Sequence, residues 1–138
     1  MKFFFIISCF LLLSVFSSAW AQSAPGNYIF VYYFHTTFRC PTCYKIEQYT
    51  QKAVEKYFDK EIKTGTISFK AVNVEREKNQ HYIKDYQLFS KAVVISMVKG
   101  GKEVKFNNLT KIWENVRDKE KFYEYIKAAT AKYLEEVK

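Results

Sequence analysis

The chain has 138 residues, 49% of them hydrophobic, and its 22 basic and 14 acidic side chains give a formal charge of +8. That length and apolar fraction predict one domain with an ordinary core. Four Gly and two Pro exclude collagen-like and Pro-rich linker architectures, and three Cys are too few for a disulfide-dense miniprotein.

Residues 1–21 have the pattern of a secretory signal peptide. Lys2 precedes a largely apolar run from Phe3 to Phe16, and the small-x-small sequence Ala19-Trp20-Ala21 follows. We expect cleavage after this sequence. The chain would then divide into a signal peptide, 1–21, and a single domain, 22–138.

An uncleaved membrane anchor and a lipoprotein are the alternatives for this segment. The apolar run of about 14 residues would be about 21 Å long as a helix, shorter than a hydrocarbon core of about 30 Å. A lipid-modified cysteine would end the apolar run, whereas Cys9 lies inside it. Both alternatives are therefore weaker than cleavage.

Cleavage would change the length, the charge and the cysteine content of the chain. Removing residues 1–21 from the 138 leaves 117 residues, 21 basic against 14 acidic side chains, and a charge of +7. Cys40 and Cys43 are then the only cysteines. Export would place them where disulfides form and persist, which is the periplasm if the cell is Gram-negative.

The first two predicted elements of the domain flank the sequence Arg39-Cys40-Pro41-Thr42-Cys43. Tyr28–Phe34 is a continuous aromatic and β-branched run, typical of a central strand buried on both faces. From Pro41 to about Asp59 the apolar residues recur every three or four positions. This spacing predicts an amphipathic helix with Pro41 in its first turn, where a missing N–H costs little.

The next predicted elements complete a sheet. A strand over Ile67–Val74, with its far end buried, leads through a polar crossover to a short helix at His81–Tyr86. A third strand over Ala92–Val98 is joined through a Gly-Gly turn to a fourth over Glu103–Asn107. In this fourth strand we expect two side chains to face the core, Val104 and Phe106, and two to face solvent, Lys102 and Lys105.

Two helices are expected to close the chain. A short one carries a core stripe of Leu109, Ile112, Trp113 and Val116, and Asp118 is the expected N-cap of a longer one that reaches Val137. The order is β-α-β-α-β-β-α with an extra helix before the last. It predicts an α/β fold with a central mixed four-stranded sheet flanked by helices.

A CxxC pair that follows an apolar strand and opens a helix is the motif that carries chemistry here. With this element order, the chain resembles the thioredoxin-like superfamily from Tyr28 to Val137. More narrowly, Tyr32–Cys43 followed by Lys45-Ile46-Glu47 looks like a bacterial exported group labelled ArsF-like, or nitrophenyl-compound nitroreductase subunit. The resemblance implies a thioredoxin-like fold and an exported thiol-disulfide oxidoreductase that needs no cofactor.

The residues of the motif suggest separate roles. Cys40 precedes the unpaired N–H groups of the helix, whose positive charge can lower a thiol pKa from about 8.5 to between roughly 3.5 and 7.5, so it is the expected attacking thiol. Arg39 would stabilise the thiolate, and Cys43 would resolve the mixed disulfide. Pro41 and Thr42 would tune the redox potential. Because Thr42 replaces the imidazole that strong oxidants often carry, a reductase or isomerase is favoured.

The chain departs from the superfamily opposite the CxxC, where a cis-proline is usual. Its prolines are Pro25 and Pro41, and Ala92 is expected at the cis-proline position. A cis bond before a residue other than proline costs about 2.5–4 kcal/mol, so we expect the Lys91–Ala92 bond to be trans or strained. Two consequences would be weaker clamping of an extended peptide and room for a metal or metalloid at the thiols.

Four residues are expected to face the substrate: Phe38, Lys91, Ala92 and His35. Phe38 is predicted to be an exposed rim beside the active site. The first strand lacks the buried carboxylate of many thioredoxins. Proton transfer to Cys43 would then need water, Tyr33 or His35.

Three other functions compete with the redox hypothesis. The first is a metal or metalloid binder with Cys40 and Cys43 as ligands; a Cys2His2 site with His35 and His81 is disfavoured because the histidines lack the usual spacing. The second is a non-catalytic thioredoxin-like interaction module. The third is an inert structural disulfide. Because it would close a loop of only four residues, it would stabilise the folded protein by only about 2 kcal/mol.

Partners follow from the same considerations. We expect a protein or small-molecule thiol or disulfide substrate, a redox donor and a monomeric protein. The scattered lysines favour an ordinary solvated surface over nucleic-acid binding. A contact with an anionic membrane surface or an acidic partner is the alternative interpretation of the charge.

Overall fold

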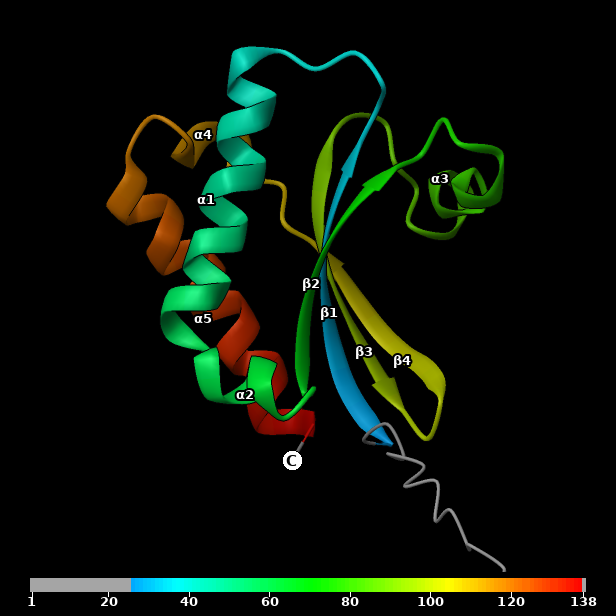
Figure 1. Ribbon diagram of the computed structural model, residues 1–138, viewed down its shortest axis with the longest axis vertical. Helices are drawn as coiled ribbons and strands as arrows, with labels where there is room; N and C mark the ends of the chain where they lie inside the picture. The colour runs from blue at the N-terminus through cyan, green and yellow to red at the C-terminus, as the bar shows by residue number, and fades with distance from the viewer. Residues whose placement is uncertain (1–25, 138) are drawn as a thin grey trace, which may run out of the picture.

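The computed structural model describes residues 26–137 (Figure 1). The expected signal peptide, 1–21, lies outside the described residues. The strands are β1 (Asn27–His35), β2 (Ile67–Asn73), β3 (Ala92–Lys99) and β4 (Lys102–Asn108). The helices are α1 (Pro41–Tyr57), α2 (Asp59–Lys63), α3 (His81–Asp85), α4 (Ile112–Asn115) and α5 (Lys119–Val137), with a 3₁₀ turn at Glu77–Asn79. No helix within the described part of the chain is long and apolar enough to cross a membrane.

The strands form one mixed sheet in the order β2-β1-β3-β4. β1 runs parallel to β2, with Ile29 opposite Ile67, and antiparallel to β3, with Val31 opposite Ile95. The parallel pair is connected through α1 and α2, because strands that run in the same direction need a crossover. The element order and the mixed four-stranded sheet confirm the predicted fold, including the extra helix before the last.

The central strand β1 is covered on both faces, as its sequence predicts. Ile29, Val31 and Tyr33 belong to the larger core cluster, which is shared with α1 and α5. Tyr32 and Phe34 point to the opposite face and pack in a second cluster with aromatic side chains of the α3 region. Figure 1 shows α1 and α5 on one side of the sheet and α3 on the other.

Strand β4 does not have the expected alternation. A register shift in its pairing with β3 leaves Val104 as an extra residue, and such a β-bulge interrupts the two-residue period. Val104 and Phe106 are 53% and 40% exposed, whereas the Lys105 ammonium group pairs with Glu136 of α5. The expectation is therefore wrong for Val104 and Lys105. Phe106 is only partly covered, with its ring against the buried Tyr86 at 4.9 Å between centroids, and Lys102 is exposed as expected.

The edge strand β2 and the helix boundaries are closer to expectation. β2 buries Ile67 at its start as well as Val74 just beyond its end, so burial is not confined to its far end. The predicted helix over Pro41–Asp59 is interrupted at Phe58, which separates α1 from α2. The Asp118 carboxylate accepts a 3.1 Å hydrogen bond from the Lys121 N–H, which confirms it as the N-cap of α5.

Candidate active site

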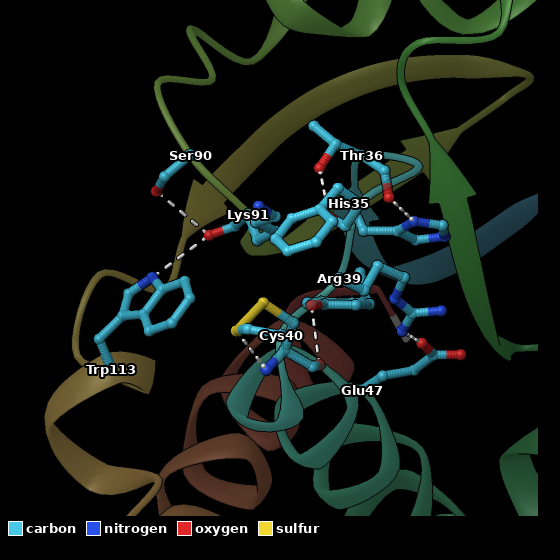
Figure 2. The surroundings of a disulfide bond; sticks show 11 residues. His35, Thr36, Arg39, Cys40, Glu47, Ser90, Lys91 and Trp113 are labelled. Atoms are coloured by element: carbon cyan, nitrogen blue, oxygen red, sulfur yellow. Dashed lines mark hydrogen bonds and ion pairs between the residues drawn. A yellow bond between two sulfur atoms is a disulfide. The ribbon is translucent and has the colours of Figure 1, made fainter.

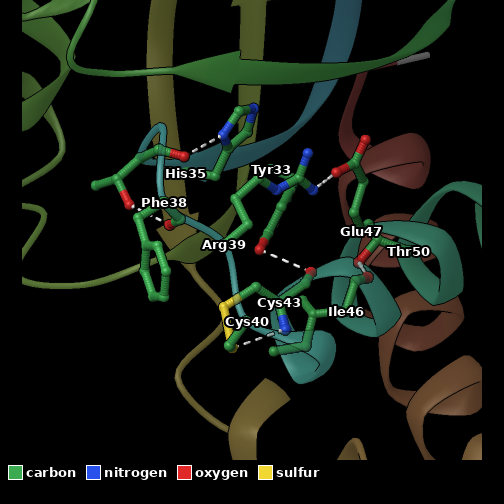
Figure 3. Close-up of polar contacts among 10 residues, drawn as sticks. Tyr33, His35, Phe38, Arg39, Cys40, Cys43, Ile46, Glu47 and Thr50 are labelled. Atoms are coloured by element: carbon green, nitrogen blue, oxygen red, sulfur yellow. Dashed lines mark hydrogen bonds and ion pairs between the residues drawn. A yellow bond between two sulfur atoms is a disulfide. The ribbon is translucent and has the colours of Figure 1, made fainter.

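A disulfide joins Cys40 and Cys43 at the start of α1, where the chain leaves the end of β1 (Figures 2 and 3). Cys40 is the N-cap residue and has extended backbone angles, and Pro41 begins the helix. The Cα atoms of the two cysteines are 5.0 Å apart. The prediction that the CxxC opens the first long helix is confirmed.

The two sulfur atoms differ in accessibility. Cys43 is 1% exposed and belongs to the buried face of α1, whereas Cys40 is half-buried. An outside thiol or disulfide can therefore reach Cys40 but not Cys43. This difference favours Cys40 as the sulfur that reacts with a partner.

The backbone around Cys40 is suited to a negative charge. The Cys43 N–H donates a hydrogen bond to Cys40 Sγ at a distance of 3.1 Å. No acidic residue lies in the first turn of α1, a helix of 17 residues, so nothing there opposes the positive end of its dipole. After reduction, the same N–H group and dipole would favour the Cys40 thiolate.

The Arg39 side chain has a carboxylate partner of its own. Its guanidinium forms an ion pair with Glu47, one turn beyond Cys43 on α1, and lies 4.2 Å from the centroid of the Tyr44 ring. Arg39 and Glu47 are 13% and 23% exposed at their side chains. The positive charge is thus largely compensated, and stabilisation of the Cys40 thiolate by Arg39 stays a prediction. Glu47 is therefore a residue of the site that its position in the sequence did not indicate.

Tyr33 connects the central strand β1 to Cys43. Its hydroxyl donates a 2.8 Å hydrogen bond to the Cys43 carbonyl (Figure 3). Burial raises the pKa of Tyr33 to about 12, against the opposing effect of the nearby Arg39 cation. The phenol is therefore protonated at neutral pH. In this structure it contacts the backbone of Cys43, which leaves its predicted part in proton transfer open.

His35 ends β1 and lines a different hollow, together with Asn73 and Arg76 beside β2. Its Nδ1 is 2.9 Å from the Thr36 carbonyl oxygen, and because a carbonyl only accepts, Nδ1 is the donor. Burial lowers the pKa of His35 and outweighs this hydrogen bond, which raises it, and the Arg39 and Arg76 cations lower it further. The structure therefore does not bring His35 together with Cys40 in one hollow.

The segment opposite the disulfide contains Lys91 and Ala92. The bond between them is trans, as expected in the absence of proline. Ala92 begins β3 and is only 5% exposed, while Lys91 is half-buried. Phe38 is 79% exposed, which confirms its predicted position on an exposed rim.

Trp113 differs most from its expected place. The predicted core stripe of the short helix included it, but its side chain is 38% exposed and lines a hollow with Cys40 and Thr42. The helix α4 has only four residues, and Ile112 and Val116 are the side chains on that segment that enter the core. Figure 2 shows Trp113 on one side of the disulfide and the Arg39–Glu47 pair on the other.

The arrangement gives little support to a metal site with histidines. His81 pairs with Asp85 on α3, at a distance of 2.7 Å. His35 belongs to a different element, the end of β1. Among residues 26–137 no group of three or more His, Cys, Asp or Glu side chains could hold a metal ion. Cys40 and Cys43 are the remaining candidates for a thiol-only ligand pair.

Comparisons with known proteins return thioredoxins among solved structures. No family model and no curated protein matches the chain. A thioredoxin from Fasciola hepatica is 24% identical, with 65% of this chain and 79% of that chain covered and a TM-score of 0.39. A reduced thioredoxin pre-protein from Schistosoma mansoni is 22% identical, with 70% and 81% covered and a TM-score of 0.41. At these TM-scores neither structure assigns a family or a function to this chain.

Proposed function

We propose that the protein is a thiol-disulfide oxidoreductase that acts through reversible oxidation of Cys40 and Cys43. The observation that carries this proposal is the placement of the pair at the N-terminus of α1, with Cys40 accessible and Cys43 1% exposed. A structural staple needs no such asymmetry. A redox pair needs one sulfur that meets the partner and one that is shielded from it.

The proposed reaction reduces a substrate disulfide and oxidises the two cysteines. In the reduced protein, the Cys40 thiolate attacks one sulfur of a substrate disulfide, and the other substrate sulfur leaves as a thiolate that takes a proton from water. The Cys43 thiol loses its proton and attacks Cys40 Sγ in the mixed disulfide, which releases the second substrate thiol. Two electrons have passed to the substrate, and an external dithiol donor restores the reduced pair.

Three finer points belong to the same proposal. Thr42, which has no imidazole to stabilise the thiolate further, favours a reductase or isomerase over a strong oxidant. The pattern of residues 1–21 supports export, with the periplasm as the working compartment in a Gram-negative cell. The sequence Tyr32–Cys43 supports membership of the exported ArsF-like group within the thioredoxin-like superfamily.

Insulin reduction by dithiothreitol tests the proposed activity. Wild-type protein is expected to accelerate it, and Cys40→Ser is expected to abolish the acceleration. Gln48→Ser, an exposed change on the same helix, should keep the wild-type rate. Cys43→Ser should accumulate a mixed disulfide through Cys40, detectable as a mass increase. Acceleration by Cys40→Ser equal to that of wild type would overturn the proposal, and zinc or arsenite bound by the reduced protein without insulin reduction would favour the metal-binding alternative.

A further inference from the structure

A hollow beside the accessible sulfur combines an aromatic ring with two cations. It is lined by Cys40, Thr42, Lys45, Trp113, Val116 and Arg117, and we call it the cationic cleft. The first three of these residues come from the start of α1, and the last three come from α4 and the turn after it. The cleft therefore lies where a substrate bonded to Cys40 must place its neighbouring atoms.

Among residues 26–137, no ion pair neutralises the two cations of the cationic cleft. Lys45 and Arg117 are both exposed, and neither forms an ion pair with another residue of the described chain. No carboxylate is among the six lining residues. Glu47 is paired with Arg39, and Glu114 lines the adjoining hollow with Arg117. The net charge next to Cys40 on this side is positive.

Trp113 supplies an apolar surface that is fixed in place. Its indole Nε1 donates a 3.3 Å hydrogen bond to the Lys91 carbonyl, which ties α4 to the segment opposite the disulfide (Figure 2). The ring also lines a second hollow with Phe89 and Lys91. Because Phe89 is 99% exposed, the apolar surface continues beyond the cationic cleft. This continuity favours a polypeptide over a small disulfide molecule as the occupant.

We propose that the cationic cleft selects polypeptide substrates in which an acidic residue flanks the cysteine that Cys40 attacks. The inference rests on the proposed oxidoreductase function and names its substrate class. In the mixed disulfide, the flanking carboxylate faces Lys45 and Arg117, and the neighbouring apolar residue packs on Trp113. Opposite charges increase the rate of encounter, and like charges disfavour basic partners.

Three disulfide-linked peptide dimers provide the test. They share one sequence except for the residues on either side of the cysteine, which are Asp, Asn or Lys. Pre-reduced protein is mixed with each dimer in a single turnover. The second-order rate constant for reduction is divided by that for reduction by dithiothreitol alone, which corrects for intrinsic differences in disulfide reactivity. The normalised values are expected to fall in the order Asp, Asn, Lys, with about three- to tenfold between the first two at low salt. High salt should shrink these ratios, because it screens exposed charges.

Matched double variants locate the effect. Lys45→Gln with Arg117→Gln is expected to bring the ratio of the Asp-peptide rate to the Asn-peptide rate close to one. Because both rates come from the same variant, this ratio does not depend on any change in the reactivity of Cys40. Lys52→Gln with Lys121→Gln removes the same charge from exposed positions that do not line the cleft, and should keep the preference. Chemical unfolding of both variants checks that they are folded.

The outcomes separate this inference from the function on which it rests. Equal normalised rates for all three peptides, or a preference that survives in the Lys45→Gln, Arg117→Gln variant, would overturn the inference and leave the oxidoreductase function intact. Failure to reduce any peptide together with failure to reduce insulin would overturn both. A preference for the Lys peptide would contradict the assigned sign of the charge.

Discussion

The Tyr33 hydroxyl donates a 2.8 Å hydrogen bond to the Cys43 carbonyl and so ties the central strand to the first turn of α1. The bond lies among buried groups, because Tyr33 is fully buried and Cys43 is 1% exposed. It holds the shielded cysteine against β1 with an uncharged donor, at a strand that carries no carboxylate. The position of the disulfide is therefore set by the core as well as by the helix.

Removing this hydroxyl should weaken the fold and the site together. Tyr33→Phe keeps the ring but removes the hydroxyl that donates to the buried Cys43 carbonyl, and we expect a loss of about 0.5–1.5 kcal/mol in the free energy of unfolding. Guanidinium chloride unfolding measures it. Tyr28→Phe, a partly exposed tyrosine on the same strand, is the control and should change stability by less than about 0.5 kcal/mol. Equal unfolding midpoints for the two variants would show that the hydrogen bond does not contribute to the stability of the fold.

Glu47 neutralises much of the Arg39 charge that would otherwise act on Cys40. Glu47→Gln leaves the mostly buried guanidinium without its counter-charge, so we expect a loss of about 1–3 kcal/mol in stability. The freed positive charge should lower the pKa of the Cys40 thiol in the reduced protein, seen as iodoacetamide alkylation that persists to lower pH. Glu55→Gln, an exposed change on the same helix, should leave both quantities unaltered. An unchanged alkylation profile in Glu47→Gln would remove Arg39 from the set of thiolate stabilisers.

His35 should make stability depend on pH below neutrality. Burial and the Arg39 and Arg76 cations lower its folded pKa, and they outweigh the raising effects of the hydrogen bond to the Thr36 carbonyl and of Glu75. The unfolded chain then takes up a proton near pH 6.5, before the folded protein does. The contribution of neutral His35 is fully present above that pH and is lost as the pH falls through the folded pKa.

Unfolding midpoints at pH 7.5 and pH 5 measure this loss. Wild type should lose more stability between the two values than His35→Asn, whose side chain does not titrate. An NMR titration of the His35 ring protons should give a midpoint below 6.5. A midpoint at or above 6.5 would contradict the structural account of its surroundings.

Sequence patterns predict this fold where local periodicity and tertiary packing agree. The strand over Tyr28–Phe34 and the helix that begins at Pro41 appear as expected, because each carries an unbroken apolar face. Asp118 was predictable as an N-cap from the residues around it. The redox chemistry proposed for Cys40 and Cys43 could be predicted from their place between a strand and a helix.

The features that the sequence did not predict depend on tertiary structure. Trp113 has core spacing, but a helix of only four residues leaves one side of it open beside Cys40. The bulge at Val104 comes from the register of β4 against β3, which no local pattern specifies. The pairing of Arg39 with Glu47 joins residues from a loop and a helix turn. The signal available in the sequence was the placement of opposite charges, Arg39 and Glu47, on either side of the CxxC pair.

The reduction potential of the Cys40–Cys43 pair tests the central claim most directly. Protein is equilibrated in glutathione buffers for the higher potentials and dithiothreitol buffers for the lower ones, free thiols are alkylated, and the reduced fraction is read by mass. A redox-active pair should give a midpoint between about −270 and −120 mV, the range of thiol-disulfide catalysts. A midpoint below about −300 mV, the range of structural disulfides, would contradict the proposed function.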